Sequence, residues 1–441
     1  MKVLTRFFDR LVQRYLPDAF LFAIILTIFV YLLGVFLTGS GPMEMITYWG
    51  GGFWDLLEFG MQMSLVVVTG YILASTPLVK RFLAKLSRVA KTPEQAVMLV
   101  TFVALIACLI NYGFGLVAGA LFAVHVAKRV PAVDYRILIA SAYSGMVIWH
   151  GGFSGSIPLL IATPGHFLED TIGLILVTET LFSSFNLFIV VTLLITLPLF
   201  NRYLLKGADP LGKVDPSLWK EESEEETGAE VQQPATPAER IENSQVLSLL
   251  IGLMGLIFVG YHFVTNGFDL NINIVNFIFL FLGIILHRTP SRYLETLGNG
   301  VKNAGGIIVQ FPFYAGIMGM MVSSGLSDKI SLWFVSFSTE YTLPIFTFIS
   351  AGIVNALVPS GGGQWAVQGP IMIQAALEIG ADTAKTAMAV AWGDAWTNMI
   401  QPFWALPVLA IAGLKIRDIM GFCVMILLFS FIPIAVGFLL L

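Results

Sequence analysis

The second half of the chain repeats a sparse set of residues from the first half, in the same order. The matched positions are Gly50 and Gly52 with Gly298 and Gly300, Gln62 with Gln310, Gly70 with Gly316, Asn111 with Asn355, Gly145 with Gly393, and Pro158 with Pro407. The spacing between partners stays nearly constant, as an internal duplication predicts. Because the chain contains 42 glycines, chance alignment is the alternative explanation.

The composition indicates whether the chain folds in water or in a membrane. Hydrophobic residues make up 57% of the 441 residues and charged residues 12%, which excludes a soluble domain. Apolar runs such as 19–37 and 186–200 lack the period-two alternation of a β-barrel and approach the roughly 20 residues that a helical crossing needs. We therefore expect an all-α polytopic membrane protein, in which Cys108 and Cys423 are buried free thiols.

The distribution of basic residues predicts the topology. Helices are predicted at 19–38, 52–77, 136–165 (broken), 172–203, 245–266, 271–287, 299–325, 383–412 (broken) and 416–440. With a cytoplasmic N-terminus, only Lys329 and Lys385 among the Lys and Arg residues fall outside.

This layout also predicts the domain organisation. Residues 1–205 form an N-terminal membrane repeat, and 206–244 form a disordered cytoplasmic linker rich in Glu and Pro. Residues 245–266 form an extra transmembrane helix, which makes 267–441 an inverted copy of the first repeat. Inverted-topology repeats are typical of secondary transporters.

Two further apolar pairs, at 95–127 and 341–378, are divided by helix-breaking residues. Their arms contain only about 12 to 16 uncharged residues, fewer than the ~20 needed for a crossing. The tips are Asn111-Tyr112-Gly113-Phe114-Gly115 and the stretch from Asn355 to Gln364. Irregular backbone at membrane depth requires surrounding protein or a watery cavity, so we expect re-entrant hairpins with polar tips near the midplane. Full crossings joined by a surface turn are the alternative.

The sequence also breaks two helices, at Trp149–Ser156 and at Trp396–Pro402. Helix N-termini at such breaks suit a carboxylate, and carbonyl and hydroxyl oxygens suit a small cation. No Lys or Arg lies in these segments. The predicted substrate-binding residues are Asn111, Gly113, Gly115, His150, Ser154, Ser156, Asn355, Ser360, Gly361, Gly362, Gly363, Gln364, Thr397 and Asn398. Apolar walls from Phe114, Phe153, Trp365 and Trp396 would favour a short alkyl tail over a second charge.

Ionisable residues within the membrane are costly and usually functional. Asp394 is the first candidate for coupling transport to a cation or proton, with Asn398, Asn355 and His150 as further candidates. The alternatives are that Asp394 caps a half-helix and that His150 is only hydrogen-bonded in place. No metal site is expected, apart from sodium at the Asn111 and Asn355 tips.

Other classes of protein fit this sequence less well. A membrane enzyme would need clustered His, Asp or Cys residues, and the five histidines are scattered, so the chain is not expected to be an enzyme. The absence of a GxxxxGK[ST] loop argues against ATP as the energy source. The runner-up is a cation/proton antiporter, or a carrier of inorganic anions or dicarboxylates, which would have more buried acids.

Two motifs resemble a known family. The stretch Asn-x-x-x-Pro-Ser-Gly-Gly-Gly-Gln-Trp-x-x-Gln-Gly-Pro at 355–370 and the block Trp-Gly-Asp-x-Trp-Thr-Asn-x-x-Gln-Pro at 392–402 are similar to the short-chain fatty acid uptake (AtoE-type) family of the ion transporter superfamily. The likeness covers nearly the whole chain. It implies a symporter of short monocarboxylates such as butyrate or acetoacetate, coupled to protons or sodium, in the bacterial cytoplasmic membrane.

The resemblance also implies an architecture. Members of the superfamily form homodimers in which a mobile domain of hairpins and broken helices slides, like an elevator, against a scaffold of the remaining helices. No cofactor beyond the coupling ion and no nucleic-acid partner are implied. Dicarboxylate carriers of the superfamily have Ser-Asn-Thr at both hairpin tips, whereas these tips read Asn111-Tyr112-Gly113 and Pro359-Ser360-Gly361. The sodium sites of those carriers therefore cannot be transferred directly.

Overall fold

The computed structural model describes residues 19–205, 236–355, 358 and 360–441, and every regular element in them is a helix. The first half contains α2 (Ala19–Leu33), η1 (Gly34–Thr38), α3 (Pro42–Gly52), α4 (Leu57–Ala74), α5 (Pro77–Leu86), η2 (Ser87–Val89), α6 (Pro93–Ile110), α7 (Tyr112–Arg129), α8 (Tyr135–Tyr143), η3 (Ser144–Gly151), α9 (Ser156–Ile161), α10 (Glu169–Ile172) and α11 (Ser184–Leu205). The second half contains α13 (Pro237–Glu242), α14 (Gln245–Asn266), α15 (Ile272–His287), α16 (Pro290–Gly300), η5 (Val301–Asn303), α17 (Gly305–Ser323), α18 (Leu326–Val335), α19 (Leu343–Val354), α20 (Gly361–Ile379), α21 (Thr383–Thr397), η6 (Asn398–Ile400), α22 (Pro402–Ala412) and α23 (Ile416–Leu440).

The helices are those of a multi-pass membrane protein, as predicted. Within the described residues, six helical stretches are long and apolar enough to cross a bilayer, among them α11, α14 and α23. Most of the predicted linker lies outside the described residues, as do Ala356, Leu357 and Pro359 of the second tip. Residues 237–242 of the linker form α13, which Thr236 and Glu239 cap reciprocally.

Most predicted helices are confirmed, with three differences. The helix expected at 172–203 begins only at Ser184, because Gly173 ends α10 with φ 66° and Ser183 accepts a hydrogen bond from the Asn186 amide (3.4 Å). The short helices α3 and α16 were not predicted, since each is polar or glycine-rich. Three of the four hairpin arms are longer than expected. Helices α6 and α7 have 18 residues each and α20 has 19, whereas α19 has 12.

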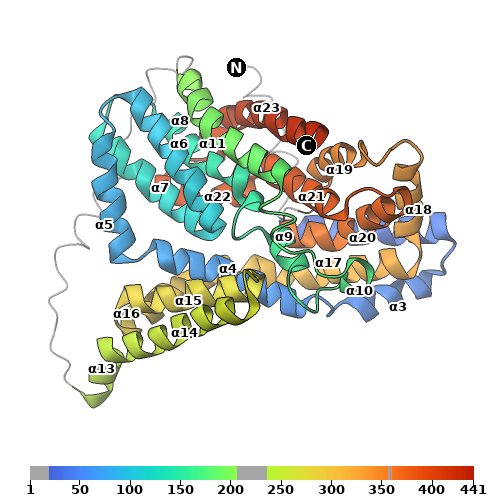
Figure 1. Cartoon of the computed structure of the whole chain (residues 1–441), viewed down its shortest axis with the longest axis horizontal. Coiled ribbons are helices and arrows are strands. Elements are labelled where there is room, and N and C mark those ends of the chain that lie inside the picture. The colour runs from blue at the N-terminus through green and yellow to red at the C-terminus, as the bar shows by residue number, and fades with distance from the viewer. Residues whose placement is uncertain (1–18, 206–235, 356–357, 359) are drawn as a thin grey trace.

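The helices fall into two groups that lie side by side (Figure 1). In the first group α2 and α3 pack on α17, while α15 and α16 pack on α4, and α14 covers α15. In the second group α6 packs on α7, α11 and η3, and α19 packs on α21 and α23. Contacts of α4 with α7 and of α17 with α20 join the two groups, so that the first turns of α7 and α20 lie at their boundary.

Glycines allow the broken helices to approach the hairpin arms closely. A Cβ added at Gly145 would lie 2.6 Å from the Ala104 carbonyl oxygen of α6, and one at Gly393 would lie 2.5 Å from the Phe348 carbonyl oxygen of α19. Only glycine fits such backbone-to-backbone contact. These two contacts, one in each half, hold the broken helices against the hairpins.

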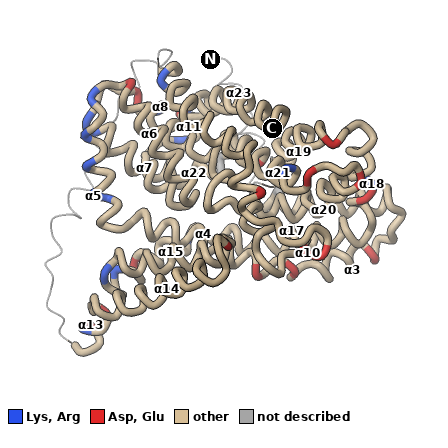
Figure 2. The backbone as a smooth tube through the Cα atoms, viewed as in Figure 1, with Lys and Arg blue, Asp and Glu red and all other residues tan. Residues whose placement is uncertain are grey.

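Charged residues are unevenly distributed along the long axis of the molecule. Figure 2 shows Lys and Arg gathered at the end that contains α5 and α13, and Asp and Glu around α3, α10 and α18 at the opposite end. Helix α5 alone carries Lys80, Arg81 and Lys85. The two ends of the molecule therefore differ in charge, as expected for two sides of a membrane.

Candidate functional site

The first hairpin turns at Asn111, which is fully buried between α6 and α7. Its side-chain oxygen caps α7 by accepting from the Phe114 amide (2.9 Å), and its Nδ2 donates to the Val66 carbonyl oxygen of α4 (3.3 Å). The neighbouring Tyr112 amide donates to Ser154 Oγ (2.8 Å). Asn111 and Ser154 therefore hold the tip in place, and both ends of the Asn111 amide are occupied by protein.

The second hairpin turns before α20, which Ser360 caps by accepting from the Gly363 amide (3.4 Å). A Cβ at Gly362 would lie 2.7 Å from the Phe59 ring, and one at Gly363 would lie 2.4 Å from the Tyr314 ring. These two glycines thus let the tip pack on aromatic residues of α4 and α17. Gln364 donates to the Ala351 carbonyl oxygen (2.9 Å), which ties the two arms together.

Asn355 joins the second hairpin to the second broken helix. Its Nδ2 lies within hydrogen-bond distance of the Asp394 carbonyl oxygen (3.0 Å), Thr397 Oγ1 (2.9 Å) and Asn398 Oδ1 (2.9 Å). Its own carbonyl oxygen accepts from Gln401 Nε2 (2.6 Å). The predicted residues Asn355, Thr397 and Asn398 are therefore brought together in one buried network.

The centre of the site is a buried pair formed by His150 and Asp394. Nε2 of His150 lies 3.2 Å from Oδ2 of Asp394, and neither side chain is exposed to solvent. Asn398 Nδ2 donates to the same carboxylate oxygen (3.1 Å). His150 and Asp394, which were both predicted as coupling residues, therefore lie next to each other although they come from different halves of the chain.

The tip of the second hairpin rests directly on this pair. A Cβ at Gly361 would lie 2.4 Å from His150 Nε2 and 2.6 Å from Ser156 Oγ. Several buried polar atoms here have no hydrogen-bond partner among the described residues: Ser156 Oγ, His150 Nδ1, Asp394 Oδ1, Asn355 Oδ1 and Gln364 Oε1. Because a buried polar atom without a partner is costly, this cluster is suited to binding a polar ligand or ion.

Two other predicted residues lie at the first tip, apart from this cluster. Gly115 packs inside the first hairpin, since a Cβ there would lie 2.4 Å from Cys108 Sγ. Gly113 lies against α4, since a Cβ added there would lie 3.1 Å from the Val67 carbonyl oxygen. Gly115 therefore serves helix packing, whereas Gly113 lines the cavity described below.

The aromatic surroundings differ from those expected. Phe153 is 40% exposed and packs against Phe182, and Trp396 packs on Phe348 and Phe431, so neither lines the pair. The ring of Trp149 instead lies 3.7 Å from that of His150, centroid to centroid. Tyr112 of the first tip lies 4.6 Å from Trp149, so the two tips are connected through Trp149 and His150.

Sequence reasoning missed several residues that support the site. Tyr143 donates to the Asn398 and Gln401 carbonyl oxygens of the second break. Asn186 of α11 donates to the Gly151 carbonyl oxygen (3.2 Å) and accepts from Trp392 Nε1 (2.9 Å), so it binds both broken helices. Nothing local in the sequence distinguishes these residues, because their partners are distant in the chain.

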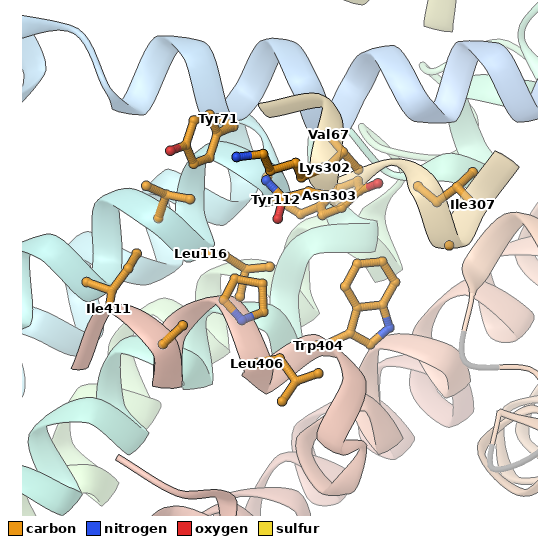
Figure 3. Close-up of a pocket in the computed structure, with 15 residues that line it drawn as sticks. Val67, Tyr71, Tyr112, Leu116, Lys302, Asn303, Ile307, Trp404, Leu406 and Ile411 are labelled. Carbon is orange, nitrogen blue, oxygen red and sulfur yellow. The ribbon is translucent and has the colours of Figure 1, made fainter. Parts of the chain in front are cut away.

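A cavity of about 390 Å³ lies beside the first tip, between α4, α7, α22 and the η5–α17 segment (Figure 3). Its polar lining includes Tyr112, Lys302 and Asn303, while Leu116, Trp404, Leu406 and Ile411 supply apolar surface. Lys302 is a cation that the sequence did not place near the tips, because it comes from outside the hairpins and broken helices.

The described residues contain no group of three or more His, Cys, Asp or Glu side chains suited to a metal ion. Cys108 and Cys423 are free and buried, as predicted.

Solved structures with a similar fold include two transporters. The Alcanivorax borkumensis YdaH transporter is matched with a TM-score of 0.60 and 16% identity over 95% of this chain and 98% of that one. Neisseria gonorrhoeae MtrF, described as representing a class of antimetabolite efflux pumps, is matched with a TM-score of 0.54 and 15% identity over 99% and 97% of the two chains. At these identities the likeness establishes the fold alone.

Sequence relatives are much more similar. A protein of Escherichia coli (strain K12) is 48% identical over 98% of both chains, and one of Haemophilus influenzae (strain ATCC 51907 / DSM 11121 / KW20 / Rd) is 46% identical over 97% of this chain and 96% of its own. Each is named "Putative short-chain fatty acid transporter". The model of the family "Short chain fatty acid transporter" matches residues 1–441. Together with the helical fold and the predicted resemblance, these matches establish that the chain belongs to the short-chain fatty acid transporter family.

Proposed function

We propose that the protein is a symporter that takes up short-chain monocarboxylates such as butyrate or acetoacetate, driven by a proton or sodium gradient. The observation that carries this proposal is the buried His150–Asp394 pair, which lies under the tip of the second hairpin. An ionisable pair at this depth is costly unless it has a function, and its two residues can gain or lose a proton or neutralise a cation. Symport, the coupling ion and the substrate are proposals that rest on this geometry and on family membership.

The contacts between the two halves support inverted repeats. Helix α2 packs on α17 while its counterpart α15 packs on α4, which is the exchange that a two-fold relationship produces. Counterparts also lie at opposite ends of the molecule: α5 and α16 at one end, α18 and α3 at the other (Figure 1). An in-plane two-fold axis, as in inverted-topology transporters, accounts for both observations.

The burial of the tips supports re-entrant hairpins. Asn111 and Asn355 are fully buried, whereas a surface turn between two full crossings would be exposed. Although α6 is long enough to cross, it ends inside the protein at Asn111. The hairpins α6–α7 and α19–α20 approach the centre from opposite ends (Figure 1). Buried irregular backbone of this kind is compatible with membrane depth.

The division into two groups supports an elevator mechanism. The group with the hairpins and broken helices would move, and the group with α2–α4 and α14–α17 would be the scaffold. Helices α11 and α23 pack on each other and on the hairpin group, so we assign them to the moving part and not to the scaffold. The predicted homodimer would form through the scaffold, and its existence remains a prediction.

The hydrogen bonding favours one tip over the other as a sodium site. Both ends of the Asn111 amide are bound to protein, whereas Asn355 Oδ1 and Asp394 Oδ1 have no partner among the described residues. An ion at the second tip would therefore find oxygen ligands already positioned, and the first tip offers fewer. A proton would instead reside on His150 or Asp394.

The charge distribution supports the proposed orientation. The Lys- and Arg-rich end would face the cytoplasm, which places the α5 end inside and the α18 end outside. The bacterial cytoplasmic membrane is the compartment that this orientation and the family suggest.

Transport by purified protein in liposomes tests the proposal. We expect uptake of labelled butyrate or acetoacetate above that of protein-free liposomes, driven by an inward proton or sodium gradient. Assays at a pH well above the pKa of the acid keep the membrane-permeant neutral form scarce, so that passive entry does not hide the carrier. Failure to take up any short monocarboxylate under either gradient, while another solute moves, would contradict the proposal.

A further inference from the structure

We propose that the cavity beside the first hairpin tip is the binding site for the acid, with Lys302 and Tyr112 binding the carboxylate and the apolar wall binding the alkyl chain. The inference rests on the proposed function and deepens it, since it assigns substrate recognition to residues outside the His150–Asp394 cluster. The cavity extends between α4, α7, α22 and η5–α17, and its volume of about 390 Å³ lies in the range of small-molecule sites.

The polar side of the cavity attracts an anion. None of the lining residues is Asp or Glu, and Lys302 is the single cation among them. The lysine ammonium contacts Asn299 Oδ1 (3.0 Å) on its own segment and is otherwise open to solvent. Tyr112 is only 1% exposed, yet its hydroxyl has no hydrogen-bond partner among the described residues. A carboxylate between these two groups would accept from both, and the positive N-terminus of α7 lies beside it.

The opposite, apolar side of the cavity is suited to the alkyl chain of the acid. In Figure 3 the labelled Trp404, Leu406 and Ile411 lie across the cavity from Tyr112, Lys302 and Asn303, with Leu116 between them. This wall offers nothing to balance a second negative charge, so a dicarboxylate would leave one carboxylate unpaired against apolar surface. The site is therefore suited to a monocarboxylate with a short alkyl chain.

The position of the cavity connects binding to movement and coupling. Lys302 and Val67 belong to the proposed scaffold, whereas Tyr112 and Trp404 belong to the proposed moving group. Sliding of one group along the other would separate Lys302 from Tyr112 and weaken their joint hold on the acid. Tyr112 also packs against Trp149, which packs against His150, so the site adjoins the ionisable pair.

Protection of an engineered cysteine tests binding without relying on transport. Ala410 lines the cavity and is exposed, while the native Cys108 and Cys423 are buried, so Ala410→Cys provides a single reactive thiol for a maleimide. Butyrate should slow labelling of the purified full-length protein. Butylammonium, which has the same number of carbon atoms and the opposite charge, and succinate, which has a second carboxylate, should not.

Substitution of the lysine tests the role of its charge. Lys302→Met in the Ala410→Cys background should raise the butyrate concentration for half-protection about tenfold, as expected for loss of one charge-assisted hydrogen bond at a solvent-exposed site. Lys302→Arg should retain most of the protection, which separates loss of the positive charge from the effect of replacing the lysine side chain. Lys85→Met on α5 removes an exposed lysine far from the cavity and should leave protection unchanged.

The two assays separate failure of this site from failure of the proposed function. Two results would overturn this site if the wild-type protein transports butyrate: no protection of the Ala410→Cys thiol and an unchanged KM for butyrate in Lys302→Met. The proposed function would then still stand. Equal protection by butylammonium would also overturn it. Selective protection by butyrate without any gradient-driven transport would support the site and refute the symport proposal.

Discussion

Substitution of Asp394 by Asn is the sharpest test of the coupling proposal, because it keeps the shape of the side chain and removes its charge. Oδ2 of Asp394 lies 3.2 Å from His150 Nε2 and 3.1 Å from Asn398 Nδ2, and all three side chains are buried. An asparagine can turn its oxygen toward the same two nitrogens, so the local packing should survive. It cannot, however, release a proton or neutralise a cation.

The expected size of the effect follows from the burial of the pair. Removing one member of a buried ion pair leaves the other charge unpaired, at a cost of about 3–5 kcal/mol. Since 1.4 kcal/mol corresponds to a factor of ten, a loss of about 3 kcal/mol makes the charged state of His150, or a bound cation, at least roughly a hundredfold rarer. We therefore expect gradient-driven initial uptake by Asp394→Asn to fall by about two orders of magnitude.

Paired measurements in liposomes distinguish lost coupling from lost folding. Driven uptake and exchange of external for internal butyrate should both be measured above protein-free liposomes; the variant should lose the first and keep part of the second. Asp382→Asn is the matched control, because Asp382 caps the same helix by accepting from the Lys385 amide (3.0 Å) and Asn caps equally well. Wild-type accumulation by Asp394→Asn would refute the coupling role of this residue.

Three further predictions concern packing and the second tip. Gly115→Ala should lower the thermal unfolding midpoint, since overpacking against Cys108 costs about 1–3 kcal/mol, whereas Gly260→Ala on α14, where an added Cβ meets nothing within 4 Å, should leave the midpoint unchanged or raise it. Asn355→Ala should destabilise the protein by about 1–3 kcal/mol and slow uptake, because it leaves buried acceptors unpaired; a denaturation series and a transport assay check both effects, and wild-type behaviour would contradict the network. Cys108 and Cys423 should react with a maleimide only after denaturation, as followed by mass spectrometry, and rapid labelling of the folded protein would disagree with their burial.

The local features of the fold could be read from the sequence. Long apolar runs predicted the crossings, and Asn111 and Ser360 were placed at the hairpin tips, where each now caps a helix. The sequence did not indicate where some helices begin or which elements pack against one another. The start of α11 was misplaced because the turns before it are themselves apolar, so hydropathy does not distinguish them from helix. Helices α3 and α16 were missed for the opposite reason, since α3 is rich in glycine and α16 is polar, so hydropathy does not distinguish them from loops.

The sequence predicted which residues belong to the candidate site better than it predicted how those residues are arranged. His150, Asp394 and Asn398 were all named from their place at helix breaks, and the structure unites them. Lys302 was not named, because it lies on a segment with no break of its own and reaches the cavity only through the packing of η5 on α4. Contacts between elements from different halves depend on tertiary packing, which residue patterns along a single chain do not encode.

The proposed duplication explains why the site contains one ionisable pair and not two. His150 and Asn398 are separated by the same 248 residues as Gly145 and Gly393, so they occupy equivalent positions in the two breaks, and both lie beside the Asp394 carboxylate. At the same spacing, the counterpart of Asp394 is Met146, which is fully buried and apolar. A carboxylate at both positions would bring like charges together in a buried site and raise the cost of ionising either. Under the proposed duplication, divergence at these positions keeps the paired geometry of the breaks and leaves a single acid for His150 to face.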